Sequence, residues 1–275
     1  MRSYTAAMPQ LLAVVLLLLG GSVPLQAAAD TLRIGGTGAA LGMMNRLAAA
    51  YRSETAGAEI EVLPSLGSSG SLRALAEGAI DIAVSARALK PKEAEAGLRA
   101  APLSRTPFVM VTSRQDAQPL AAAALAGLYA DPKATWSDGT PLRVILRPQS
   151  DSDSAFLERH FDGMAKALAK ARQRAEVPMA KTDQENIRLA TRIDGSLTTA
   201  TLTQVVSENA AVTVVTLDGV APTLENLESG RYPFFKELVI ARRVDAGPSV
   251  LAFLAFVDSP QGRQILRDSG NLPPR

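Results

Sequence analysis

Cysteine is absent from all 275 residues, and histidine occurs only once, as His160. Without cysteine the chain has no disulfide, no thiol nucleophile, no iron–sulfur cluster and no zinc site of the cysteine type. A single histidine excludes a metal site with several histidines, and a serine–histidine–aspartate triad would have to use His160. His160 lies in FLERHFDGM, whose pattern is helical, so we expect a surface or packing role for it.

An excess of charge of one sign is lacking too. Lysine and arginine number 29 against 27 aspartate and glutamate, so no broad basic surface for nucleic acid is expected. Apolar residues make up 47% and charged residues 20% of the chain, which permits a sizeable core and argues against bulk disorder. The length suits one large domain or two small ones. Any charge on a ligand must therefore be balanced by residues at its binding site.

The first 29 residues differ from the rest. Arg2 precedes an apolar run at residues 11–19, and helix breakers and small residues follow this run up to residue 29. That order predicts a secretory signal peptide over residues 1–29, a mature chain that begins near Asp30, and a periplasmic location. A membrane anchor is the alternative, but the apolar run is shorter than the roughly 20 residues that a membrane span needs.

After this segment, short apolar runs alternate with stretches of helical periodicity. Strands are predicted in TLRIGG, EIEVLPS, IDIAVSA, TPFVMVTS, LRVILRP and AVTVVTLDG. Helices are predicted in ALGMMNRLAAAYRSET, SLRALAEGA, PLAAAALAGLYADP, in one long stretch over residues 153–174, and in two pieces near the C-terminus with a restart at Ser259. The alternation is typical of an α/β sheet with crossover helices.

Three loops that join a strand to a helix are rich in glycine, hydroxyl groups or arginine. The first holds Thr37, Gly38 and Ala39, the second Ser68, Ser69 and Gly70, and the third Arg147, Ser150, Asp151, Ser152 and Asp153. In open α/β sheets ligands bind where strands end and helices begin, and the free N–H groups of a helix start suit an anion. Arg147 can hold an oxyanion by two parallel hydrogen bonds. The alternative is helix capping and tight turns.

Other ligands fit these loops poorly. The first loop lacks the full glycine spacing of a dinucleotide site, and no acidic residue follows a suitable second strand to bind a ribose. The alternation in the third loop resembles a calcium loop, but the glycine and the terminal glutamate of that motif are missing. In a fourth loop, KTDQENIRLA, Thr182 or Asp183 is expected to cap a helix. No cofactor is therefore expected.

The mature chain resembles the periplasmic phosphate-binding proteins of ABC transporters, which have the type II periplasmic-binding-protein fold. The motifs that carry the resemblance are GGTGAALG, PSLGSSGSLRAL, IDIAVSARALK, LRPQSDSDS and, most specific, LDGVAPTLENLESGRYPFFKELVIA. The family fold has two α/β lobes with the ligand between them and two strands joining them. It implies a first lobe over residues 30–110 and 236–275 and a second over residues 111–235. PFVMVTS and YPFFKELVIA would be the hinge strands, and the lobes would close on the ligand by a hinge motion.

When the family's binding residues are placed on this sequence, only some of them find a matching residue. The family's phosphate-binding serine falls on Ser68 and its arginine on Arg147, whereas its first-loop threonine falls near Gly38 and Ala39, beside Thr37. Two departures stand out.

The serine and threonine that follow the family's arginine are Asp151 and Asp153 here. The aspartate that accepts the ligand's proton in known members is Ala86, followed by Arg87. Our hypothesis is that Asp151 or Asp153 supplies the missing acceptor, while Arg147 and Arg87 offset its charge. The alternative places both carboxylates in solvent at the start of a helix.

The resemblance implies a solute-binding protein and not an enzyme. It would capture inorganic phosphate and deliver it to the inner-membrane permease of an ABC importer, as a monomer and without nucleic acid. Three alternatives stay open: another oxyanion such as molybdate, tungstate or sulfate, a sensor or adaptor without transport, and an exported phosphohydrolase. The last has no evident metal cluster and no evident nucleophile with a base.

Overall fold

The computed structural model describes Met1 and residues 31–274, so the predicted signal peptide lies, apart from Met1, outside the described residues. Within the described part of the chain, no helix combines the length and the apolar character that crossing a membrane requires. The chain forms an open mixed sheet in the order β2-β1-β3-β8-β4-β6-β5, with β7 paired to β4. The predicted α/β class is confirmed.

The first third of the chain builds one side of this sheet. Its elements are β1 (Leu32–Gly36), α1 (Gly38–Glu54), β2 (Ile60–Val62), α2 (Gly67–Ala76), β3 (Ile82–Ser85) and α3 (Pro91–Glu95). Strand β1 pairs in parallel with both β2 and β3, which requires crossover helices, and α1 and α2 supply them. The carboxyl ends of β1 and β3 and the starts of α1 and α2 consequently lie at one edge.

The middle of the chain builds the other side. Its helices are α4 (Leu125–Ala130), α5 (Ser152–His160), α6 (Met164–Arg172), α7 (Asp183–Arg192), α8 (Leu202–Ser207) and α9 (Leu224–Glu228), and a short 3-10 turn covers Ala122–Ala124. Its strands are β5 (Arg143–Val144), β6 (Ser196–Thr201) and β7 (Thr213–Val215). The chain then returns through β8 (Phe235–Arg243), α10 (Pro248–Asp258) and α11 (Pro260–Asp268).

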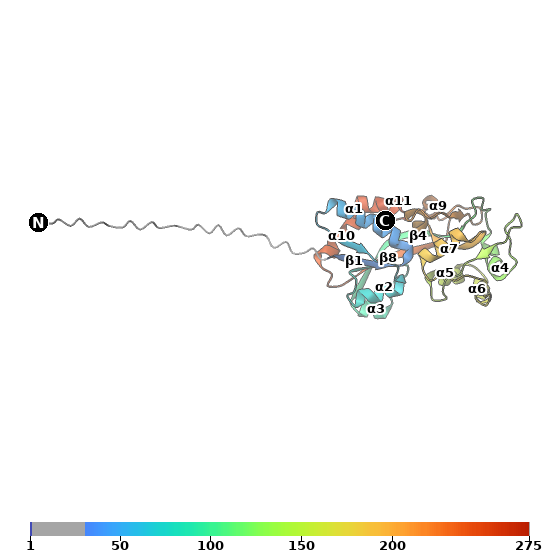
Figure 1. The fold of residues 1–275 in the computed structure, drawn as a ribbon, viewed down its shortest axis with the longest axis horizontal. Helices are drawn as coiled ribbons and strands as arrows, with labels where there is room; N and C mark the ends of the chain where they lie inside the picture. The colour runs from blue at the N-terminus through green and yellow to red at the C-terminus, as the bar shows by residue number, and fades with distance from the viewer. Residues whose placement is uncertain (2–30, 275) are drawn as a thin grey trace.

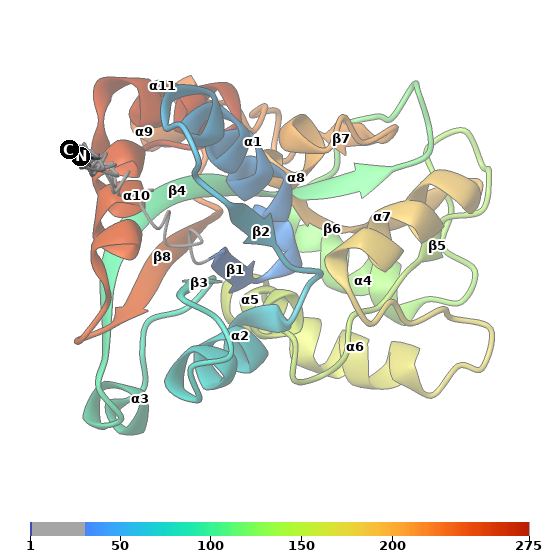
Figure 2. The ribbon, with the colours of Figure 1, turned by 60° about the vertical axis from the view of Figure 1, so that its left-hand side comes forward.

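Two long antiparallel strands join these two sides. Strand β4 (Leu98–Thr112) pairs with β8 from Leu98 to Pro107, and its last residues pair with β6 and β7 instead. Figure 1 shows α4 to α7 gathered at one end of the molecule and α2, α3 and α10 at the other. In Figure 2 β4 runs from the side of α3 and α10 across the molecule toward β7.

The cores follow the same division. One large cluster packs α1 and α10 on β1 and β3, and another packs α5 and α6 around Phe108 and Trp136. The fold is thus the two-lobed one of type II periplasmic binding proteins.

Away from the two strands, the lobes also touch through α1. Arg46 Nη2 donates to the carbonyl oxygens of Val206 at 2.8 Å and of Ser207 at 3.2 Å, and these carbonyls lie at the end of α8. One and two turns earlier on the same face, Gly42 and Gly38 leave no room for a side chain, because a Cβ there would collide with α8 and α7 respectively. Helix α1 of the first lobe therefore packs directly on the second lobe.

Several elements differ from the prediction. The long helix over residues 153–174 is two helices, α5 and α6, because the backbone of Phe161 is extended after α5 and Gly163 adopts φ 77° before α6. The strand predicted in LRVILRP is only the two-residue β5, and β6 was not predicted, because its sequence SLTTAT lacks an apolar run. The predicted restart at Ser259 is confirmed, since its hydroxyl accepts a hydrogen bond from Gly262 N.

Candidate functional site

A cleft of about 850 Å³ lies between the two lobes. The starts of α2, α5 and α7 open into it, and one face of β8 lines it through Phe235, Glu237 and Val239. Among the predicted site residues, nine line the cleft: Thr37, Ser68, Ser69, Gly70, Arg87, Arg147, Ser150, Asp151 and Ser152. Gly38, Ala39 and Asp153 do not line it.

The first lobe contributes hydrogen-bond donors through α2. This helix has no side-chain cap and no acidic residue in its first turn, so its first N–H groups remain free. Ser68 Oγ accepts a hydrogen bond from Ala86 N at 3.0 Å, which fixes the hydroxyl and leaves its proton available to a ligand. Where the family has an acceptor carboxylate, Ala86 thus contributes a backbone amide that orients Ser68. The end of α2 that faces the cleft suits an anion.

Arg87 lies beside these donors but is already paired. Its guanidinium contacts both carboxylate oxygens of Glu93, at 2.6 and 2.8 Å, and donates to Ser69 Oγ at 3.1 Å. The hydrogen bond with Arg87 holds the pKa of Glu93 below its ordinary value. The charge of Arg87 is therefore balanced largely by Glu93, within the first lobe.

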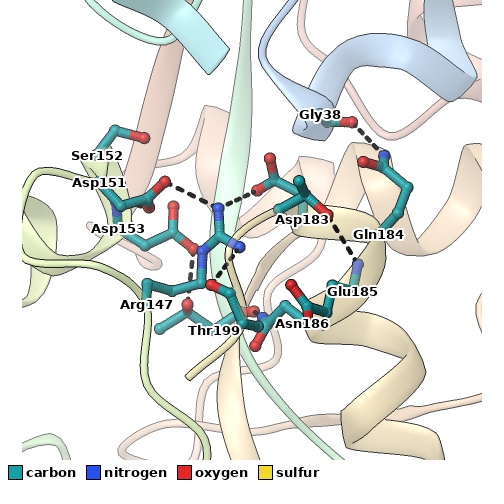
Figure 3. Close-up of polar contacts among 12 residues, drawn as sticks. Gly38, Arg147, Asp151, Ser152, Asp153, Asp183, Gln184, Glu185, Asn186 and Thr199 are labelled. Carbon is teal, nitrogen blue, oxygen red and sulfur yellow. Dashed lines mark hydrogen bonds and ion pairs between the residues drawn. The ribbon is translucent and has the colours of Figure 1, made fainter. Parts of the chain in front are cut away.

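Arg147 is the buried cation of the second lobe, with 4% of its surface exposed. Its Nη2 lies 2.8 Å from Asp151 Oδ2 and 3.6 Å from Asp183 Oδ1, and its Nη1 donates to Ala180 O at 3.1 Å. Figure 3 shows the guanidinium between the two carboxylates. Burial alone would lower the pKa of Arg147, but Asp183, Asp151 and Asp153 together raise it, so the side chain stays charged.

Asp151 both caps a helix and pairs with Arg147. Its Oδ1 accepts from Asp153 N at 2.8 Å and so caps α5, while its Oδ2 pairs with Arg147 at the wall of the cleft. Of the two carboxylates proposed as acceptors, only Asp151 lines the cleft.

Asp153 instead points into the second lobe, where it is 3% exposed. It forms an ion pair with Lys236, and Thr199 Oγ1 donates to its Oδ2 at 2.6 Å. Burial alone would raise the pKa of Asp153, but Lys236, Arg147 and these hydrogen bonds outweigh it and hold the pKa below its ordinary value. Lys236 also donates to Ser152 Oγ at 2.8 Å, so β8 is tied to the start of α5.

Asp183 is the site residue that the sequence analysis missed. It was expected at most to cap a helix, and Thr182 takes that role by accepting from Glu185 N at 3.1 Å. Asp183 follows the cap, lines the cleft and lies against Gly38, where a Cβ would collide with its Oδ2.

Next to Asp183, Gln184 donates to Gly38 O at 2.9 Å (Figure 3). Asp183 and Gln184 thus cover the start of α1, which explains why Gly38 and Ala39 do not line the cleft.

The carboxyl group of Asp183 has a raised pKa. Burial raises its pKa to about 6, the nearby Asp153 carboxylate adds to this rise, and Arg147 opposes it. An aspartate with a pKa near 6 in a cleft can be neutral in mildly acidic conditions, so the charge of the site depends on pH.

Asp183→Asn is expected to change how stability depends on pH. The pKa of about 6 in the folded protein exceeds the roughly 3.9 of an unfolded chain, so folding binds this proton more tightly. The stabilising contribution is complete below about pH 4 and is lost as the pH rises through about 6. Between these values the free energy of unfolding of the wild type should fall relative to the variant, by up to about 3 kcal/mol.

Urea unfolding from pH 4 to 7.5 measures this difference. Asp194→Asn, which removes an exposed carboxylate outside the cleft, is the matched control. Parallel stability curves for the wild type and Asp183→Asn would show that Asp183 does not titrate in this interval.

A metal site finds no support in the residues described here: they contain no group of three or more histidine, cysteine or acidic side chains placed to hold an ion. The site is thus an assembly of hydroxyl groups, free amides and one deep arginine, with carboxylates beside the arginine. Chemically it can bind an oxyanion, and one that carries a proton suits the carboxylates.

The family model of the PBP superfamily domain matches residues 22–261. No curated protein matches the chain. Among solved structures, a protein of Clostridium perfringens described as a phosphate ABC transporter substrate-binding protein, with bound phosphate, is similar with a TM-score of 0.76 and 18% identity, over 90% of this chain and 100% of that one.

Two further structures are similar. An ABC-type phosphate transport receptor from Vibrio cholerae has a TM-score of 0.61 and 19% identity, over 88% of this chain and 100% of that one. The periplasmic molybdate-binding protein of Azotobacter vinelandii has a TM-score of 0.60 and 15% identity, over 89% of this chain and 100% of that one. At these identities the structures establish the fold. The family model covers most of the chain, and the protein belongs to the PBP superfamily, the periplasmic binding proteins.

Proposed function

We propose that this protein is an exported solute-binding protein that captures phosphate between its lobes and delivers it to the permease of an ABC importer. One observation carries the proposal: Arg147 lines the cleft from the second lobe, while Ser68 and the free N–H groups of α2 line it from the first. An ion held by both would link the lobes. The family consists of binding proteins, so the chain is a binding protein and not an enzyme.

Capture by both lobes would favour the closed arrangement. The proposed boundaries are residues 30–110 with 236–275 for the first lobe and 111–235 for the second, and β4 and β8 are the proposed hinge strands. An anion that contacts both sides binds the closed form better than the open one and so shifts the population toward it. A permease can distinguish the two forms, and a sensor without transport would use the same change.

The choice of phosphate rests on the carboxylates. Asp151 lines the cleft 2.8 Å from Arg147, so it can accept a hydrogen bond from a protonated oxyanion. It would repel sulfate or molybdate, which have no proton to offer. The phosphate-bound Clostridium perfringens structure supports phosphate as the ligand, and the Azotobacter vinelandii structure keeps molybdate as the second candidate.

Thermal unfolding of the mature protein, refolded in anion-free buffer, tests this proposal. Phosphate, sulfate, molybdate and tungstate are added separately. A ligand at roughly 100 times its dissociation constant adds about 2.7 kcal/mol, so phosphate should raise the melting temperature by several degrees. A rise in melting temperature with molybdate or sulfate, and none with phosphate, would support an oxyanion-binding protein but reject phosphate as its ligand. No rise with any anion would reject the proposed function.

A further inference from the structure

The proposed position of the oxyanion, between Arg147, Ser68 and the start of α2, is called the oxyanion seat. One face of α5 runs along the cleft away from this seat. Ser152, Ala155, Phe156, Arg159 and His160 all line the cleft, and their spacing places them on one side of the helix. The seat lies at the start of this helix, near Ser152. A helix rises 1.5 Å per residue, so Arg159 follows Ser152 by about 10 Å along the axis. A single inorganic phosphate at the seat leaves most of this face uncovered.

The charges along the cleft divide into two groups. Near the seat every cation has an acidic partner: Arg147 with Asp151 and Asp183, Lys236 with Asp153, and Arg87 with Glu93.

The second group consists of Lys90, Arg159 and Lys181. They also line the cleft, yet none has an acidic partner within 4 Å among the residues that the structure describes. Glu237 also lines the cleft and has no cationic partner within 4 Å among the described residues, so the unpaired charges of the cleft are three positive and one negative. Of the three cations, Arg159 lies on α5.

Between the seat and Arg159 the wall is largely apolar. The ring of Phe156 lies 4.1 Å from that of His160 and 4.1 Å from that of Phe108, measured between centroids, so it is held in place. Ala155 beside it has a small side chain, which leaves space. The C–H groups of a short organic chain can pack against such a wall while its hydroxyl groups face the open cleft, whereas a second hydrated ion would find no hydrogen-bond partner there.

We infer that the cleft takes an organic phosphate with a second anionic group, such as a phosphorylated sugar acid. The phosphate occupies the seat, the carbon chain lies along Ala155 and Phe156, and the carboxylate reaches Arg159. Helical side chains lean toward the start of their helix, which brings the guanidinium of Arg159 back toward the seat. The inference rests on the proposed oxyanion seat and adds to it the ligand class.

Isothermal titration of the refolded mature protein with three ligands tests the inference. The ligands are inorganic phosphate, 6-phosphogluconate and sorbitol 6-phosphate, of which the last two differ at one end, where a carboxylate replaces a hydroxymethyl group. We expect 6-phosphogluconate to bind about tenfold more tightly than sorbitol 6-phosphate, as one charge-assisted hydrogen bond provides. Arg159→Ala should abolish that difference and change the affinity for inorganic phosphate less than about twofold. Arg188→Ala, on the exposed side of α7, is the matched control.

The outcomes separate the two claims. If phosphate binds and the two esters bind equally, the inference is wrong and the proposed function stands. If Arg159→Ala weakens the binding of all three ligands equally, Arg159 acts only by long-range electrostatic attraction, and the inference is wrong as well. If only 6-phosphogluconate binds, the inference is supported and inorganic phosphate is rejected as the ligand. If no ligand binds, the proposed function fails, and the inference fails with it.

Discussion

Arg147→Met should reduce phosphate affinity at least about 100-fold, because it removes the one deep cation that can bind an oxyanion bidentately. Its guanidinium is 4% exposed and faces the cleft between Asp151 and Asp183. Without it, an arriving phosphate would meet two carboxylates and no neighbouring arginine from the second lobe. Arg147→Lys keeps the charge but loses the planar fork, so we expect an intermediate loss of about tenfold.

Titration calorimetry with phosphate measures this effect. Arg143→Met is the matched control, because Arg143 is exposed on β5 and does not line the cleft. Both variants should first be shown to unfold cooperatively, since Arg147→Met also leaves two carboxylates without their partner. Phosphate affinity within about threefold of the wild type in Arg147→Met would show that the ion binds elsewhere.

The largest effect on stability is expected from Lys236→Met. Lys236 and Asp153 are 5% and 3% exposed, and they form a buried pair that also involves Thr199 and Ser152. Removing one partner leaves a buried charge uncompensated, so the free energy of unfolding should fall by about 3–5 kcal/mol. Urea unfolding at neutral pH measures the loss, and a loss below about 1 kcal/mol would contradict the assignment.

A second variant and the pH dependence separate the ion pair from simple packing. Adding Asp153→Asn to Lys236→Met removes the unpaired charge and should recover part of the lost stability. In the wild type the pKa of Asp153 is held low, so the contribution of the pair is lost only as the pH falls through that low value. In Lys236→Met the carboxyl takes up a proton more readily. The gap between the two proteins should therefore narrow on acidification.

The outline of the fold could be predicted because it depends on local pattern. Buried strands such as β3 are mostly apolar, with Ile82, Ala83 and Val84 before Ser85, and helices such as α1 show their own periodicity. Strand β6 could not be predicted from apolar pattern because SLTTAT is buried although half of its residues are threonine. Their hydroxyl groups form hydrogen bonds inside the protein, such as Thr198 Oγ1 to Asn186 Oδ1 at 2.9 Å. The break between α5 and α6 depends on the extended backbone of Phe161 and the positive φ of Gly163, neither of which the apolar pattern encodes.

The site was predictable only in part, for a similar reason. Ser68, Arg147 and Asp151 lie where a strand leads into the first turn of the next helix, and the carboxyl ends of strands are where ligands bind in such sheets. Asp183 is the first residue of α7, in a stretch that looks like an ordinary helix start, and Lys236 belongs to a strand. Only tertiary packing brings Asp183 to Arg147 and Lys236 to Asp153. Asp153 likewise does not line the cleft, and its partner Lys236 lies 83 residues later in the chain.

Equilibrium dialysis of radiolabelled phosphate against the refolded, anion-free mature protein is the measurement that tests the central claim most directly. The account predicts saturable retention of one phosphate ion per chain, displaced by excess unlabelled phosphate and absent in Arg147→Met. No saturable retention by the wild type, or equal retention by Arg147→Met, would contradict an oxyanion site built on Arg147 between the lobes.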